Sequence, residues 1–337
     1  MSNTPKLTIA IPVYERKEYF DEALQSALAQ TSPVNILIID NASSHDYFAN
    51  AVEACGSSFV SYYRNTENIG MYGNWNRCVE LCSTEFVALL GDDDFLEKEY
   101  AELFYKALDE NPTISFYHCA YNRFGEGFHE AQQPYKAPVG LHSGKQLLEN
   151  AAVLGVNINT NAMIFRKSLH STFKFEYVRW AYNQDWLFCY SAFASEIGFG
   201  QEKVMIQVRV NPTGNALTVG ARAYLSTGLI YERITQKLVE YKSAYAALAV
   251  SKGKWVLRNA LINGHMQLIN DMTADKENPF GQYLNKLLFE DPLSKNILNT
   301  RNKTVQKTLV NVLRFVRKNH NIYRKFFYRS LIESVEI

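Results

Sequence analysis

Short apolar runs and amphipathic stretches alternate along the first 120 residues of the chain. The apolar runs have the length of buried strands, and the stretches between them repeat apolar positions at helical spacing. The predicted strands are 7–13, 34–40, 59–63, 86–90 and 114–118, and the predicted helices are 18–30, 46–54, 74–82 and 97–110. This alternation predicts an α/β fold with a mostly parallel, Rossmann-like sheet flanked by helices.

The pattern changes in the second half of the chain. Residues 122–140 are polar with Gly and Pro, which predicts an irregular loop or hairpin, and strand-like runs return at 161–165 and 203–210 around an aromatic helix at 186–193. From about residue 222 the pattern is helical to the end, with breaks expected near Gly253, Asn278–Pro279 and Asp291–Pro292. We therefore expect an α/β domain at 1–220 and a helical C-terminal extension at 221–337.

Composition narrows the class of protein. Of the 337 residues, 47% are hydrophobic and 20% are charged, as in an ordinary globular protein, and a formal net charge of +1 predicts no nucleic-acid partner. The five cysteines are odd in number and scattered, which argues against a disulfide framework or a zinc finger. The N-terminal apolar run is too short for a signal peptide, and no stretch has the roughly 18 apolar residues of a membrane span. These features predict a cytoplasmic, reduced protein.

Polar, acceptor-rich segments follow each of the first four predicted strands. In an open α/β sheet, ligands bind beyond the carboxyl ends of the strands, so these segments mark one candidate binding edge. The four segments are Pro12–Arg16, Asp40–Ser43, Arg64–Gly70 and Gly91–Asp94.

The run Asp92–Asp94 is the strongest chemical signal. Three adjacent carboxylates repel one another, and beside a buried strand a cation is expected to neutralise them. Mg²⁺ and Mn²⁺ prefer such oxygen ligands and leave coordination positions for substrate phosphates. The alternative is that the run caps the helix predicted at 97–110, and Asp94 is the member best suited to a structural role.

In this order and spacing, the segments IPVYER, IIDNAS, RNTENIG and LLGDDD, with a later Gln184-Asp185-Trp186, resemble glycosyltransferase family 2. The resemblance covers about residues 7–220. It implies a GT-A fold and an inverting transfer of sugar from a nucleotide-sugar.

The resemblance also implies roles for the residues at the strand ends. Pro12, Tyr14, Glu15 and Asp40 would hold the base and ribose, and Asn68 and Gly70 would lie near the diphosphate and donor sugar. The family's D-x-D motif aligns with Gly91-Asp92-Asp93, so that Asp93 would bind Mn²⁺ or Mg²⁺. Asp92 would supply the ribose or phosphate contact that is missing because Gly91 stands where an Asp is common.

By the same resemblance, Asp185 is the general base that takes the proton from the acceptor hydroxyl. Gln184 replaces the family's Glu at an acceptor contact, and Trp180 and Trp186 would suit a sugar-binding surface. The alternatives are that Asp185 only caps the helix and that the aromatic residues belong to the core.

These residues predict a metal-dependent glycosyltransferase, with a UDP-sugar as the default donor and a glycan or lipid-linked glycan as the acceptor. The setting implied by the family is bacterial surface polysaccharide or lipopolysaccharide biosynthesis. Two alternatives stay open: a non-catalytic nucleotide-sugar-binding protein of the same fold, and a sugar nucleotidyltransferase. The latter is expected to carry a Gly-rich loop after the first strand, and IPVYERKE has no glycine.

The last 37 residues are strongly basic. From Arg301 onward there are nine Lys or Arg residues and two Glu residues, interleaved with apolar positions. One interpretation is peripheral contact with the cytoplasmic face of the inner membrane. The other is that Leu309, Val312, Leu313, Val316 and Phe326 pack on the catalytic domain or on a second copy of the chain in a homo-oligomer.

Overall fold

The computed structural model describes residues 4–125, 128–132, 135–155, 158, 160–177, 184–210 and 221–315. The chain divides into two compact units, of which the first (the sheet unit) contains the described residues up to 210 together with 233–249. The second (the helical unit) contains 221–232 and 250–315. The predicted class is confirmed: a sheet flanked by helices is followed by C-terminal helices.

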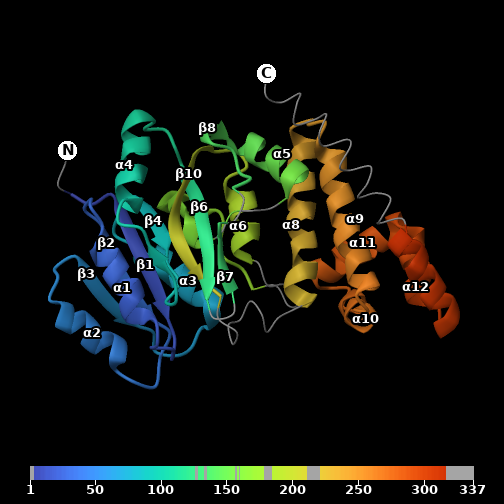
Figure 1. Ribbon diagram of the computed structural model, residues 1–337, viewed down its shortest axis with the longest axis horizontal. Helices are drawn as coiled ribbons and strands as arrows, with labels where there is room; N and C mark the ends of the chain where they lie inside the picture. The colour runs from blue at the N-terminus through green and yellow to red at the C-terminus, as the bar shows by residue number, and fades with distance from the viewer. Residues whose placement is uncertain are drawn as a thin grey trace. The chain divides into compact units, whose positions relative to one another are not determined.

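Four parallel strands form one side of the sheet (Figure 1). They are β1 (Leu7–Val13), β2 (Asn35–Asp40), β3 (Val60–Arg64) and β4 (Phe86–Leu89), in the spatial order β3-β2-β1-β4. Val13 lies opposite Asp40, and Asp40 lies opposite Arg64. The carboxyl ends of these strands therefore meet at one edge, as predicted from the segments that follow them.

The rest of the sheet is mixed. The order continues as β9-β6-β10-β5, and β9 runs antiparallel to both β4 and β6. The bounds are β5 (Phe95–Leu96), β6 (Phe116–Gly125), β7 (Phe128–Gln132), β8 (Gly140–Ser143), β9 (Met163–Arg166) and β10 (Ile197–Arg209). Part of the polar segment predicted as a loop or hairpin is the hairpin of β6 and β7.

Helices bury one apolar face each against this sheet. The bounds are α1 (Phe20–Leu28), α2 (Tyr47–Cys55), α3 (Gly70–Leu81), α4 (Tyr100–Glu110), α5 (Gly144–Leu154) and α6 (Gln184–Ala192), with short 3-10 turns at Thr160–Ala162 and Lys167–Ser171. In α1, Phe20, Ala23, Leu24 and Ala27 are buried, at the spacing that places them on one face. They join the alternating buried residues of β1 and β2 in one core cluster.

The helical unit has its own core. Its elements are α8 (Ala221–Glu240), whose last residues belong to the sheet unit, α9 (Ala246–Ile262), α10 (Met266–Ala274), α11 (Pro279–Glu290) and α12 (Pro292–Asn299), and residues 303–315 are also helical. The predicted breaks at the two prolines are confirmed, because α11 and α12 begin there.

The break predicted at Gly253 is wrong, since α9 continues through it. A Cβ on Gly253 would lie 2.3 Å from the Tyr283 hydroxyl, and one on Gly228 would lie 2.9 Å from the Tyr283 ring. The glycine in α9 therefore permits the close approach of Tyr283 rather than ending the helix.

The basic end of the chain begins inside this core. Leu313 is buried in the core cluster with Val310, and Leu309 packs against them, whereas 44% of the Val312 surface is exposed. Val316 and Phe326 lie outside the described residues.

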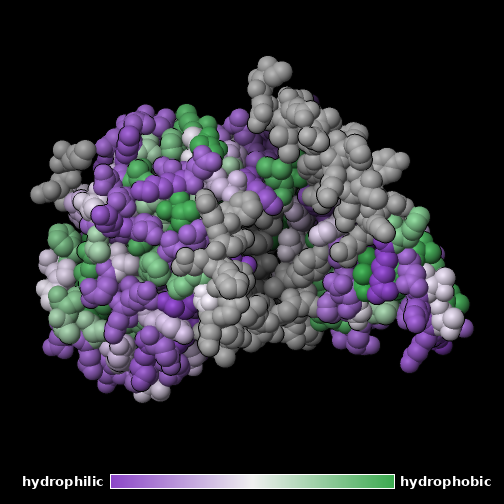
Figure 2. Space-filling model, in the orientation of Figure 1, coloured by the Kyte–Doolittle hydropathy of each residue, from purple (hydrophilic) through white to green (hydrophobic). Residues whose placement is uncertain are grey.

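Within the described ranges, no helix is both long and apolar enough to cross a membrane. On the face in Figure 2, hydrophobic and hydrophilic residues of the described part are interspersed.

Candidate active site

Direct hydrogen bonds and ion pairs link the four segments that follow β1 to β4. Glu15 after β1 is bonded to Ser43 after β2, and Asn41 after β2 is bonded to Asn68 after β3. Arg16 after β1 pairs with Asp92 after β4. The sequence predicted that these segments lie at one edge of the sheet. In the structure, direct contacts join them at that edge.

The loops after β1 and β2 are held in an unusual backbone conformation. Glu15 has φ 59° and Ala42 has φ 64°, both in the left-handed region that non-glycine residues avoid. The Ser43 hydroxyl accepts a hydrogen bond from the Glu15 amide at 2.9 Å, and the Glu15 carboxylate accepts from the Ser44 amide at 2.9 Å and from its hydroxyl at 2.8 Å. Hydrogen bonds from Ser44 lower the pKa of Glu15. Such strain persists where surrounding contacts fix it, often at ligand sites.

Asp40 anchors this part of the site. Its carboxylate is fully buried and accepts hydrogen bonds from the Ser43 amide and hydroxyl on Oδ1, at 2.9 and 2.6 Å. On Oδ2 it accepts from the Tyr62 hydroxyl at 2.7 Å and from Arg64 Nε at 2.9 Å. Burial raises the pKa of Asp40, but the hydrogen bonds together hold it below the ordinary value. Each of the two carboxylate oxygens therefore already accepts two hydrogen bonds from the protein.

Four asparagines fasten the loops after β2 and β3 to helix α3. Asn41 Nδ2 donates to Asn68 Oδ1 at 2.8 Å, and Asn65 Nδ2 donates to Asn41 Oδ1 at 3.1 Å and to Asn74 Oδ1 at 2.9 Å. Asn68 Oδ1 also accepts from the Gly70 amide at 2.8 Å, at the first residue of α3. Asn65 Oδ1 is buried without a partner among the described residues. The network carries no net charge, and each of these hydrogen bonds joins two amide groups.

In the loop after β4 (the acidic loop, Gly91–Asp94), two carboxylates form ion pairs with one arginine. Arg16 Nη1 lies 2.7 Å from Asp93 Oδ2, and Arg16 Nη2 pairs with Asp92 Oδ1. Burial raises the pKa of Asp92 to about 6, against the opposing effect of Arg16. The positive charge expected beside these carboxylates is therefore supplied by an arginine of the chain itself.

The Asp94 carboxylate is hydrogen-bonded to other partners than the Asp92 and Asp93 carboxylates are. Its Oδ1 accepts from the Arg209 amide at 2.7 Å, and its Oδ2 accepts from Asn161 Nδ2. Burial, followed by the charge of Asp93, raises the pKa of Asp94 to about 8. Asp94 is thus an internal anchor of the acidic loop, in agreement with the structural role expected for it. The capping alternative for the run is wrong, because β5 intervenes and the cap position of α4 is Glu99.

The structure explains why glycine stands at position 91. A Cβ on Gly91 would lie 2.9 Å from Asp94 Oδ2 and 3.3 Å from Asp93 Oδ1, and its amide donates to Asn161 Oδ1 at 3.1 Å. An acidic side chain at this position would add a fourth carboxylate against two others. The departure from the family motif is therefore matched to the packing of this loop.

The acidic loop fits a divalent cation that is held by only one or two protein carboxylates. Within the described part of the chain, no three Asp, Glu, His or Cys side chains gather as a metal site would require. Mg²⁺, however, is commonly bound by one or two carboxylates, with substrate phosphates and water filling its other positions. The side chains of Asp92 and Asp93 are 12% and 18% exposed and share one edge of the loop, so they suit this mode of binding.

The remaining predicted site residues divide into described and undescribed ones. Pro12 lies in β1, opposite Ile39 of β2, and Tyr14 is 46% exposed at the end of the strand. Gln184, Asp185 and Trp186 form the first turn of α6, and their side chains lie outside the described residues. Trp180 lies outside them entirely.

Two residues that support the acidic loop were missed by the sequence analysis. Asn161 bonds to both Gly91 and Asp94, and Arg209 donates through Nε to the Asp93 carbonyl at 3.0 Å as well as through its amide to Asp94. Both residues lay in runs that predicted only strands. No local signal marks them, because each contact spans at least 67 residues of sequence.

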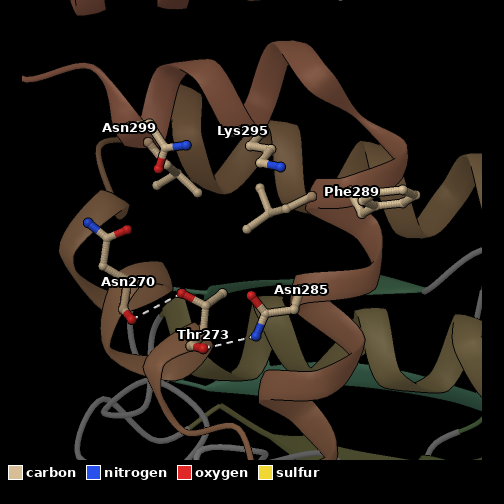
Figure 3. A pocket seen from close by; sticks show the side chains of 8 residues that line it. Asn270, Thr273, Asn285, Phe289, Lys295 and Asn299 are labelled. Atoms are coloured by element: carbon tan, nitrogen blue, oxygen red, sulfur yellow. Dashed lines mark hydrogen bonds between the residues drawn. The ribbon is translucent and has the colours of Figure 1, made fainter.

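A surface hollow of about 250 Å³ lies in the helical unit (Figure 3). It is formed by α10, α11 and α12, and its lining contains no carboxylate. The lining residues are Asn270, Thr273, Asn285, Leu288, Phe289, Lys295, Leu298 and Asn299. None of them comes from the strand ends that carry the candidate active site.

Residues 8–173 match the sequence model of the family described as Glycosyl transferase family 2. That range contains all four linked loops. Residues 8–173, just under half of the chain, have the sequence features of a family 2 glycosyltransferase domain. The resemblance inferred from the motifs is thereby confirmed.

Curated relatives are similar to part of the chain. Abequosyltransferase RfbV of Salmonella typhimurium (strain LT2) is 28% identical over 39% of this chain and 40% of its own length. The putative colanic acid biosynthesis glycosyl transferase WcaA of Escherichia coli K12 is 25% identical over 51% of this chain and 62% of its own length. The chain thus spans less than two thirds of either relative.

Solved structures of GT-A glycosyltransferases are similar in fold to most of the chain. Residues 1–349 of Staphylococcus aureus TarS, in complex with UDP-GlcNAc, match with a TM-score of 0.66 and 14% identity over 92% of this chain and 91% of that one. The mannosyltransferase PcManGT of Pyrobaculum calidifontis, in complex with GDP-Man and Mn²⁺, matches with a TM-score of 0.54 and 13% identity over 92% and 86%. The family 2 domain therefore has the expected GT-A fold.

Proposed function

We propose that this protein is a glycosyltransferase that moves a sugar from a nucleoside diphosphate sugar to an acceptor hydroxyl, with inversion at the anomeric carbon. The observation that carries the proposal is the linkage of four strand-end loops, with the exposed Tyr14 ring after β1 in one part and the acidic loop after β4 in another. A nucleoside diphosphate sugar has the matching order of parts: a neutral base and ribose, then a diphosphate that binds divalent metal.

The loops after β1 and β2 would hold the nucleoside. Tyr14 is exposed beside Pro12 and Glu15, so the Tyr14 ring and the Glu15 carboxylate would contact the base and ribose. Because both oxygens of Asp40 are committed to Ser43, Tyr62 and Arg64, Asp40 would act mainly by fixing this loop. Asn68 and Gly70 at the start of α3 would lie near the diphosphate.

The acidic loop would bind the metal and the diphosphate. Asp93 would hold Mn²⁺ or Mg²⁺, and Asp92 would contact ribose or phosphate. When bound, such an ion stabilises the negative charge that develops on the leaving nucleoside diphosphate. Mn²⁺ in the mannosyltransferase complex supports this proposal by analogy of fold.

Asp185, in the first turn of α6, would take the proton from the attacking acceptor hydroxyl, the role of a general base. Gln184, Trp180 and Trp186 would contact the acceptor. The relatives named for abequose transfer and colanic acid biosynthesis favour a glycan or lipid-linked glycan of a bacterial polysaccharide as acceptor. The UDP-GlcNAc complex favours a UDP-sugar as donor.

The test is release of nucleoside diphosphate. The full chain is incubated with UDP-, GDP-, CDP- and dTDP-sugars and Mn²⁺, with water and a panel of simple aryl glycosides as acceptors. We expect release from one donor class, faster with a fitting acceptor, and its loss on chelation of the metal. Tight nucleotide-sugar binding without any release would instead favour a non-catalytic binding protein of the same fold.

A further inference from the structure

One arginine neutralises two of the three carboxylates of the acidic loop. The guanidinium of Arg16 contacts Asp93 through Nη1 at 2.7 Å, and it contacts Asp92 through Nη2 and, at 3.4 Å, through Nε. The Arg16 side chain is 31% exposed, and the side chains of Asp92 and Asp93 are 12% and 18% exposed. The group proposed to bind metal is therefore already paired with a cation.

This pairing and metal binding compete for the same carboxylate. Arg16 Nη1 approaches Asp93 Oδ2, and a divalent ion would bind an oxygen of the same carboxylate. A guanidinium and a divalent ion a few ångströms apart repel each other strongly in a partly desolvated site. Arg16 must therefore leave Asp93 before a metal ion can bind there.

We infer that Arg16 is a latch on the acidic loop, which occupies Asp93 in the free protein and is released when metal and a diphosphate arrive together. This inference rests on the proposed function. A released guanidinium needs a new anionic partner, and phosphate oxygens match its fork of donors well. The diphosphate supplies that partner, and so each of the two ligands favours binding of the other.

The acidic loop has other supports that do not involve Arg16. Asn161 holds Gly91 and Asp94, and Arg209 holds Asp94 and the Asp93 carbonyl. The backbone of the loop is thus fixed from the side of β9 and β10. An Arg16→Ala variant should keep the loop in place and expose its carboxylates.

The experiment measures Mn²⁺ binding to the full chain by the electron paramagnetic resonance signal of free Mn²⁺. Titrations are made alone and with UDP, GDP, CDP and dTDP in parallel. For Arg16→Ala we expect Mn²⁺ alone to bind about tenfold more tightly than to the unmodified protein. We expect the factor by which the nucleotide strengthens Mn²⁺ binding to fall by about tenfold.

Three further variants sharpen the result. Arg16→Lys keeps the charge but cannot span both carboxylates with a planar fork, so its Mn²⁺ affinity should be intermediate. Arg301→Ala removes a positive charge from the helical unit and should change nothing. Asp93→Asn should abolish Mn²⁺ binding in either background.

The latch is overturned if Arg16→Ala binds Mn²⁺ with unchanged or lower affinity while the unmodified protein shows metal-dependent nucleotide binding. In that case the proposed function stands and Arg16 only orders the loop. If neither protein responds to Mn²⁺ with any of the four nucleotides, the metal-dependent function and the latch fail together.

Discussion

The loop after β2 and the acidic loop lie at the same edge of one sheet, yet different forces hold them. The first is fixed by neutral hydrogen bonds around Asn41 and by Asp40, whose four bonds leave no oxygen free. The backbone of the second is held by Asn161 and Arg209, whereas its Asp92 and Asp93 carboxylates form ion pairs with Arg16. Asp40 is thus fully buried and held by four hydrogen bonds, whereas Asp92 and Asp93 are partly exposed and paired with Arg16.

The largest expected effect is on catalysis. Asp93→Asn and Asp185→Asn should each lower transfer by between about 10² and 10⁴-fold, through loss of the metal ligand and of the base respectively. Only Asp93→Asn should also weaken metal-dependent nucleotide binding. Steady-state kinetics and nucleotide titrations separate the two, with the exposed Asp109→Asn as control. Near-normal turnover of Asp185→Asn would remove it from the mechanism.

The next largest expected effect is on the stability that Asp40 gives to the loop after β2. Asp40→Ala removes a fully buried carboxylate that accepts from Ser43, Tyr62 and Arg64, so we expect a loss of about 3–5 kcal/mol in the free energy of unfolding. Asp46→Ala removes the other, 73% exposed partner of Arg64 and should cost less than about 1 kcal/mol. Denaturant unfolding measures both. Equal losses would mean that burial of Asp40 does not set its contribution.

A buried histidine pair predicts acid sensitivity away from the site. His118 Nε2 lies 3.2 Å from His142 Nε2, the Tyr135 hydroxyl lies 2.7 Å from His118 Nδ1, and His142 Nδ1 lies 2.9 Å from the Gly140 carbonyl. All four groups are satisfied if Tyr135 donates to His118, His118 to His142 and His142 to Gly140, with both rings neutral. Burial lowers the pKa of both imidazoles below the ordinary 6.5.

The stabilisation from these neutral rings is therefore fully present above pH 6.5 and is lost as the pH falls below it. The slope should approach about 1.4 kcal/mol per pH unit for each histidine. His142→Gln keeps an acceptor for His118 and should flatten the slope by about half, whereas His265→Gln in the helical unit should not. Thermal unfolding from pH 7.5 to 5 measures this. A slope unchanged by His142→Gln would contradict the neutral pair.

The smallest effect concerns backbone strain. Ala42 has φ 64°, which glycine adopts without cost, so Ala42→Gly should raise the free energy of unfolding by about 0.5–1 kcal/mol. Ala51→Gly, inside helix α2, should lower it by about 1 kcal/mol. Denaturant midpoints of the two variants should therefore move in opposite directions. A loss of stability in Ala42→Gly would show that the loop is not strained.

The apolar pattern alone was enough to predict the four parallel strands and the edge at which they end. Val13, Asp40 and Arg64 come into register because the hydrophobic runs fix where each strand stops. The insertion of antiparallel β9 between β4 and β6 could not be predicted, since pairing partners depend on the whole sheet. The break predicted at Gly253 was wrong for a similar reason, because the residue that requires a glycine there, Tyr283, is 30 residues away.

The sequence predicted that four loops meet at one edge of the sheet, but it predicted few of the contacts between them. Local spacing indicated that Asp92–Asp94 need a neutralising cation, but nothing local shows that Arg16 supplies it from 76 residues away. Asn161 and Arg209 were missed for the same reason. Burial separates Asp94 from its two neighbours, and burial is a property of the folded sheet rather than of the three-residue run.

The most direct test of the account is a thermal-shift panel of UDP, GDP, CDP and dTDP, each with and without Mn²⁺. A ligand at 100 times its dissociation constant adds about 2.7 kcal/mol to the stability of the folded state, which corresponds to a shift of a few degrees. We predict that one nucleotide stabilises the protein, that Mn²⁺ enlarges its shift, and that Asp93→Asn removes the enlargement. A folded protein that responds to none of the four nucleotides, with or without Mn²⁺, would contradict the account.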